Sequence, residues 1–124
     1  MARVDVIEYI TIASTGNSTD FGNLTQARDP MALASSVRGV FTGGATSGQT
    51  VEYITIASTG NAQDFGDLTV NRRYVTGTSS STRGVHAGGN GGGDETYSSV
   101  MDYITIASTG DSTDFGDLVT PVNA

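Results

Sequence analysis

The chain has 124 residues, of which 17 are glycine and none is cysteine, and its formal net charge is −7. This length suits one domain, and the lack of cysteine excludes disulfides and thiolate metal sites. The negative charge disfavours binding to nucleic acid or to anionic lipid, because both ligands need a positive surface. Residues 1–10 contain no long apolar segment behind a basic start, so we expect neither a secretion signal nor a membrane span.

An internal repeat runs through the sequence. The segment YITIASTG at 9–16 recurs at 53–60 and 103–110, and each copy is followed by Asp-Phe-Gly-Asn/Asp-Leu. A second block, which contains Arg-Gly-Val and ends in Gly-Gly, occurs at 36–44 and again at 81–89. The repeats differ in length after the double glycine, which marks that junction as a surface loop.

Each complete unit is predicted to contain four short strands, because Thr, Val, Ile and Tyr dominate stretches that Gly, Asn and Ser separate. In chain order the predicted strands are Val6–Ser14, Phe21–Thr25, Met31–Ser35, Arg38–Thr42, Val51–Ser58, Phe65–Val70, Tyr74–Ser79, Arg83–Ala87, Val100–Ser108 and Phe115–Val119. They divide the single repeat domain into a half unit, 1–25, and two repeat units, 26–70 and 71–124. Gly16, Gly60 and Gly110 precede Asn or Asp, which predicts hairpin turns with a positive φ.

The strand that begins each YITIASTG segment has two faces that both avoid water. Ile10 and Ile12 share one face, and Tyr9, Thr11 and Ala13 share the other. A sheet with one wet face would alternate apolar and polar residues. We therefore expect an all-β protein whose four-stranded antiparallel sheets pack face to face on both sides, as blades do in a ring.

The order of the repeated residues resembles the kelch-type β-propeller blade. The resemblance rests on Gly43-Gly44, Tyr53, Phe65 and Arg72, and on Gly88-Gly89, Tyr103 and Phe115. Phe65 and Phe115 stand where kelch blades usually carry Trp. The wording of the repeats is also similar to kelch-like repeats in structural proteins of marine bacteriophages, especially cyanophages. This resemblance implies about two and a half propeller blades per chain and a tail-associated or other virion role, outside the host after lysis.

Two and a half blades cannot close a propeller, which typically has four to eight. The blades at both ends would leave apolar faces in water. We therefore expect head-to-tail self-association into a closed ring, in which two or three copies supply roughly five to eight blades. Three roles are open for the half unit: it caps a sheet, completes a neighbour's blade or marks a larger array.

Three motifs that could carry chemistry are better explained structurally. His86 is the only histidine and replaces Phe41 of the other unit, so we expect it in the core or lining a channel. Asp-Phe-Gly occurs three times in a chain without lysine, which excludes a kinase; we expect a turn with Phe in the core. Asp111, Asp114 and Asp117 do not fit the EF-hand spacing, although a calcium-dependent binding module stays open as an alternative. We predict a protein that is not an enzyme and needs no metal or cofactor.

Candidate binding residues come from two loops and two strands. The loops 45–50 and 90–99 differ between the units, and a propeller would bind ligands at such loops on one ring face. The candidates are Gln49, Asp94, Glu95, Tyr97, Arg38 and Arg83. The ring of Tyr97 is suited to stacking on a sugar. Arg38 and Arg83 are expected to pair with Asp or Glu of an adjacent blade or to line a channel.

The favoured interpretation is a non-enzymatic phage virion structural or adhesion module that binds surface glycan, which follows from the resemblance. The first alternative is a purely architectural ring or collar that binds other virion proteins. The second is the calcium-dependent module. Expected partners are further copies of the chain, host surface glycan and other virion proteins, with neither nucleic acid nor membrane insertion.

Overall fold

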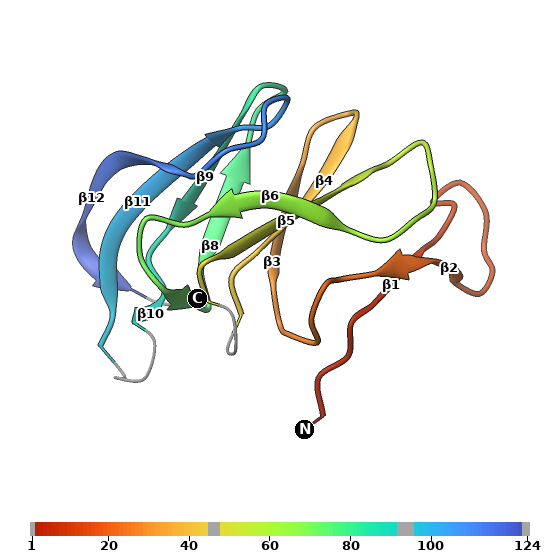
Figure 1. Cartoon of the computed structure of the whole chain (residues 1–124), viewed down its shortest axis with the longest axis horizontal. Helices are drawn as coiled ribbons and strands as arrows, with labels where there is room; N and C mark the ends of the chain where they lie inside the picture. Colours follow the sequence, from red (N-terminus) through yellow and green to blue (C-terminus); the bar gives the residue numbers. More distant parts are fainter. Residues whose placement is uncertain (1, 45–47, 92–95, 123–124) are drawn as a thin grey trace.

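The computed structural model describes residues 2–44, 48–91 and 96–122, and it confirms an all-β fold with four-stranded antiparallel sheets. Three groups of strands lie side by side along the molecule, with the N-terminal group at the right of the view (Figure 1). No helix able to cross a membrane is found in these described ranges.

The three groups follow the repeat. The half unit contains β1 (Val6–Tyr9) and β2 (Thr19–Asn23). The middle unit contains β3 (Met31–Ala34), β4 (Arg38–Thr42), β5 (Thr50–Thr55) and β6 (Gln63–Asp67) in that spatial order. The C-terminal unit contains β8 (Thr76–Ser79), β9 (Arg83–Ala87), β11 (Ser98–Thr105) and β12 (Thr113–Val122), also in chain order across the sheet. The short strands β7 (Arg72–Arg73) and β10 (Asn90–Gly91) form a separate pair.

The repeated segments have equivalent settings in the three groups. Each repeat tyrosine meets the phenylalanine of its own fourth strand edge to face, with ring centroids 6.0, 5.9 and 6.0 Å apart. Val40 is paired with Tyr53, and Val85 is paired with Tyr103 in the same register. The half unit therefore corresponds to the outer two strands, β5 and β6, of a complete unit.

Strand bounds agree with the sequence-based prediction in some places and differ in others. β4 and β9 begin and end as predicted. β5 ends at Thr55, before the predicted Ser58, because the Ser58 N–H donates to the Thr55 carbonyl (3.1 Å) and closes a turn. Equivalent bonds close the turns of the other two groups. β8 begins at Thr76 because Tyr74, at φ 54°, is not extended.

One predicted turn is confirmed in part and another is wrong. Gly60 and Gly110 lie in the loops that join antiparallel strands and have a positive φ, 158° and 156°, as predicted, but Gly16 does not. Asp-Phe-Gly is not a turn, because it lies inside the fourth strand. In β6, Gly66 pairs with Val51 and Asp64 pairs with Glu52, so Phe65 is the extra residue of a β-bulge.

The units pack face to face, and only the middle one is covered on both sides. The exposure of the second isoleucine of YITIASTG falls from the first unit to the last: Ile12 is 93% exposed, Ile56 is 44% exposed and Ile106 is 1% exposed. On the opposite face the order reverses, since Phe115 is 49% exposed but Phe21 and Phe65 are 7% and 3% exposed. Burial of such side chains stabilises a fold by about 1.5–3 kcal/mol each. At the two ends of the molecule, the repeat positions that form contacts between units inside the chain are therefore exposed.

A substitution at Gly66 tests whether β6 packs directly against the backbone of the next unit. A Cβ at Gly66 would overlap the Gly110 carbonyl of the next unit, whereas a Cβ at Gly60 would meet nothing within 4 Å. Both glycines have similar φ, 151° and 158°, so both alanine variants carry similar backbone strain. We expect Gly66→Ala to lower the free energy of unfolding by about 2 kcal/mol more than Gly60→Ala, because of overpacking. Urea unfolding followed by circular dichroism measures this, and equal losses would contradict the described packing.

Candidate functional site

In the half unit and the middle unit, the free edge of the fourth strand is bound by the next unit. β6 is an edge strand, whose outward N–H and C=O groups would otherwise remain unpaired. The Gly110 N–H donates to the Phe65 carbonyl (2.7 Å), and the Ser112 N–H donates to the Asp67 carbonyl (2.8 Å). The Asp67 N–H donates to Asp111 Oδ1 (3.0 Å). We call these three bonds the edge coupler.

The same edge coupler joins the half unit to the middle unit. The Gly60 N–H donates to the Phe21 carbonyl (2.8 Å), and the Ala62 N–H donates to the Asn23 carbonyl (2.8 Å). The Asn23 N–H donates to Asn61 Oδ1 (3.0 Å). The bulged phenylalanine and the last residue of YITIASTG thus form a contact between units.

A buried arginine ties the connection after β6 to the next sheet. The Arg72 side chain is fully buried, and its Nη2 donates to Asp102 Oδ1 (2.6 Å). Its Nη1 donates to the Gly88 and Val100 carbonyls (2.9 and 2.8 Å). The Thr69 N–H and hydroxyl donate to Asp102 Oδ2 (3.0 and 2.9 Å). A buried ion pair of this kind is costly to break on one side, since a lone charge then stays buried.

The middle unit repeats this arrangement. Arg28 forms a fully buried ion pair with Glu52, and its Nη1 donates to the Gly43 and Thr50 carbonyls (2.7 and 3.0 Å). The Thr25 N–H donates to Glu52 Oε1 (2.7 Å). The first glycine of each Gly-Gly pair therefore supplies an acceptor for the arginine.

The two ends of the chain carry the unmatched halves of these contacts. Glu8 is the equivalent of Glu52 and Asp102, but it is exposed and accepts a hydrogen bond from the Ser18 hydroxyl (3.1 Å). At the other end, Val122 stands four residues after Leu118, where the repeat has Arg28 and Arg72. The third arginine position is therefore apolar.

Arg38 and Arg83 lie over the repeat tyrosines. The guanidinium carbon of Arg38 is 4.3 Å from the centroid of the Tyr53 ring, and that of Arg83 is 4.1 Å from the Tyr103 ring. Arg38 reaches the adjacent unit, but its Nη1 donates to the Ile106 carbonyl (2.9 Å) and not to an acid. Among the described residues, the buried arginine–carboxylate pairs are made by Arg28 and Arg72 instead. For Arg38, the expected pairing with an acid of the adjacent unit is replaced by this bond to a carbonyl, whereas the pairing expected for Arg83 stays a prediction.

The loop candidates lie at the other strand ends. Gln49 is exposed and directly precedes β5, whereas Arg38 pairs with Thr55 at the far end of that strand. Tyr97 is half-exposed and directly precedes β11, as Gln49 precedes β5. Gln49 and Tyr97 thus share one end of their units, and the structure does not bring them together with the two arginines. Asp94, Glu95 and 45–47 lie outside the described residues.

His86 is fully buried between the middle and C-terminal units. Its Nε2 lies 3.1 Å from Thr42 Oγ1, and its Nδ1 lies 3.5 Å from Asp102 Oδ1. Within the described ranges, no three His, Asp or Glu side chains are grouped as metal ligands. Asp111, one of the acids considered for calcium, takes part in the edge coupler.

Comparison of the chain with protein-family models and with curated proteins finds no match. Its function is therefore inferred from the geometry of the repeat.

Asp102 gives the fold an acid-sensitive contact. Burial raises the pKa of Asp102, but the nearby His86 ring, hydrogen bonds from Thr69 and the charge of Arg72 outweigh burial and lower the pKa to about 2, from 3.8. The ionised form is thus favoured by folding. Its contribution, about 2 kcal/mol, is complete above pH 3.8 and is lost as the pH falls towards 2.

We expect Asp102→Asn to destabilise the protein at pH 6 by about 3 kcal/mol, because the Arg72 charge stays buried without its partner. The difference from the unchanged protein should shrink by about 2 kcal/mol between pH 4 and pH 2. Urea unfolding at several pH values measures both quantities. A difference that does not vary over this range would show that Asp102 is not held ionised by the fold.

Proposed function

We propose that this protein is a non-enzymatic structural module that assembles head to tail with further copies of itself into a ring of kelch-like propeller blades. One observation carries the proposal: the edge coupler is formed twice inside the chain, and its two halves are left open at opposite ends. The donor half is Gly16–Ser18 on the half unit. The acceptor half is Phe115–Asp117 on β12.

The open halves are complementary in hydrogen bonding. By analogy with the internal couplers, the Gly16 and Ser18 N–H groups of one copy donate to the Phe115 and Asp117 carbonyls of another. Asn17 then accepts from the Asp117 N–H, as Asn61 and Asp111 do inside the chain. Such a contact pairs two edges that would otherwise expose backbone groups to other strands.

The apolar faces are complementary as well. Ile10 and Ile12 are exposed on the half unit, and Phe115 and Val119 are exposed on the C-terminal unit. Their equivalents are in contact inside the chain, where Phe65 packs in one cluster with Ile104 and Ile106. A heterologous contact of this kind gives a closed ring when its rotation closes and a filament when it does not.

The contact between copies lacks one ion pair that both internal contacts have. Glu8 would meet Val122, so the arginine that pairs with Glu52 and Asp102 is missing there. The carboxylate would be partly buried without a cation, which weakens this contact. Assembly is therefore weaker than the cohesion of the chain itself, as a reversible oligomer needs.

Two further observations favour architecture over catalysis. The carboxylates of Glu52 and Asp102 are fully buried and bound to arginine, and His86 is buried as well.

The virion setting is supported by the resemblance to marine bacteriophage repeats. Glycan adhesion is the second candidate, because the exposed Gln49 and half-exposed Tyr97 share one end of the units, away from the edge coupler.

A substitution at Gly116 should disturb the contact between copies without disturbing the fold of the chain. Within the chain a Cβ at Gly116 would approach nothing closer than Met101 Cε at 4.0 Å, but its equivalents Gly22 and Gly66 abut a carbonyl of the next unit. We expect the unchanged protein to form a defined oligomer and Gly116→Ala to sediment as a folded monomer. Gly60→Ala, which carries similar strain in open space, should remain oligomeric. Sedimentation velocity over a range of concentrations measures this, and a monomeric unchanged protein would overturn the proposal.

Val122→Arg should strengthen the contact between copies, because it restores the repeat arginine opposite Glu8. A charge-assisted hydrogen bond contributes about 1.5 kcal/mol, so we expect the dissociation constant to fall roughly tenfold. The gain should disappear in the Glu8→Gln background. An equal gain with and without Glu8, measured by sedimentation equilibrium, would show that the arginine acts elsewhere.

A further inference from the structure

Strand β1 of the half unit corresponds to the third strand of a complete unit, and one of its edges is unpaired. β1 pairs with β2 on one side, while β5 and β11 pair on both sides, with β4 and β9 on the edge that β1 leaves open. β1 ends at Tyr9, but β5 and β11 continue to Thr55 and Thr105, the equivalents of Thr11. The strand is shorter where the partner strand is missing.

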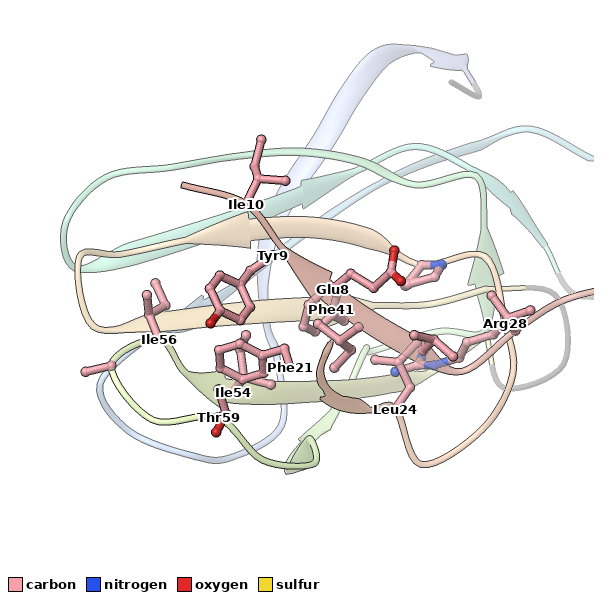
Figure 2. A pocket seen from close by; sticks show the side chains of 15 residues that line it. Glu8, Tyr9, Ile10, Phe21, Leu24, Arg28, Phe41, Ile54, Ile56 and Thr59 are labelled. Atoms are coloured by element: carbon pink, nitrogen blue, oxygen red, sulfur yellow. The ribbon is translucent and has the colours of Figure 1, made fainter. Parts of the chain in front are cut away.

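An apolar cavity of about 700 Å³ lies beside this edge, between the half unit and the middle unit. Tyr9, Phe21 and Leu24 line it from one side, and Phe41 and Ile54 line it from the other. Figure 2 shows these side chains around the cavity, with Ile10 pointing away from them. A cavity of this size and composition is within the range of binding sites.

The neighbouring contact shows what occupies the equivalent space. Between the middle and C-terminal units, Leu33 of β3 and Val40 of β4 are buried in the core. Leu33 lies directly over Gly84, where a Cβ would come within 2.8 Å of its Cδ1. Gly39 is the equivalent of Gly84, and a Cβ there would meet only Ile54 of its own sheet. The place of one leucine side chain is thus open.

Tyr9 shows a third unfilled contact. Tyr53 and Tyr103 each have an arginine over the ring, supplied by the adjacent second strand. Among the described residues, no cation lies over the ring of Tyr9, which is partly exposed. A strand carrying Arg-Gly-Val in the repeat register would place its arginine over that ring.

We propose that the half unit is a binding site for a two-stranded β-hairpin of the same repeat type, with the sequence pattern of β3 and β4. The second strand of the hairpin pairs with Ile7–Thr11, its glycine opposite Ile10 and its valine opposite Tyr9, as Gly39 and Val40 lie opposite Ile54 and Tyr53. The first strand inserts its leucine over Gly39. This is recognition by strand addition, in which backbone bonds give affinity and side-chain places give specificity.

A folded second copy does not offer such a hairpin, because β3–β4 and β8–β9 are already paired with their own third strands. The occupant is therefore an additional repeat, and the site is separate from the open edge coupler at Gly16–Ser18. Binding at one does not require the other. The hairpin site goes beyond the proposed self-assembly and is testable without it.

The test uses the full chain carrying Gly116→Ala, which removes the contact between copies, and a labelled synthetic peptide of residues 31–44. We expect saturable binding by fluorescence anisotropy, with amide signals of Ile7–Thr11 shifting and becoming protected from hydrogen exchange. A peptide with Leu33→Asp should bind at least tenfold more weakly, and a scrambled peptide should not bind. No saturable binding, or protection confined to other strands, would overturn the proposal.

A matched pair of protein variants tests the position of the peptide. Tyr9→Leu should weaken peptide binding about fivefold, because the cation–π contact is lost while apolar packing on Phe21 is kept. Tyr103→Leu should leave binding unchanged, since Arg83 already covers that ring. Equal effects of both variants would overturn the proposed register. A dimer of the Gly116→Ala protein that the peptide dissociates would overturn the proposed occupant, because an exchanged hairpin of a second copy would then fill the site.

Discussion

The structure depends on the binding of one sheet's free edge by the loop that precedes the fourth strand of the next sheet. The β-bulge at Phe65 is what makes this contact possible. The bulge turns the Phe65 side chain into the core while its carbonyl accepts a bond from the next unit. Edge protection and face-to-face burial are therefore achieved together, and a unit satisfies neither on its own.

The buried arginines add a second, more selective connection. Arg28 and Arg72 each satisfy a carboxylate and two carbonyls of the sheet that follows them. Each arginine needs a carboxylate and two carbonyls in place at once. These contacts therefore fix the position of the segment after each of β2 and β6 relative to the sheet that follows. The two end positions differ from the internal ones: Glu8 bonds to Ser18 and not to an arginine, and Val122 stands where the repeat has an arginine.

The sequence predicted the sheets well and the couplers poorly, for a physical reason. β4 and β9 were predicted to the residue, because alternation and flanking Ser and Gly are local signals. Phe65 was correctly placed in the core, but its bulge and the bond from Gly60 to the half unit were not predicted, because the pairing partners are distant in the chain. Arg28 and Arg72 were missed as well. Their signal was present in the repeat, as an arginine four residues after the leucine and an acid before the tyrosine.

The candidate binding residues could be located only in part. Gln49 and Tyr97 lie where loops were expected, and Arg38 and Arg83 belong to the packing of the tyrosines. The open strand edge of the half unit could not be found from residue types. It follows from strands that are absent from one unit and present in the others.

The difference in length between the repeats has a consequence for how such a protein diversifies. It falls after Gly44 and Gly89, at the strand ends opposite the loops that bind the neighbouring unit. The longer junction after Gly89 leaves the edge coupler intact, because Gly60 and Gly110 donate equivalent bonds to the units that precede them. Natural variation at these ends is thus free to alter what the surface recognises while the geometry of the array is inherited unchanged.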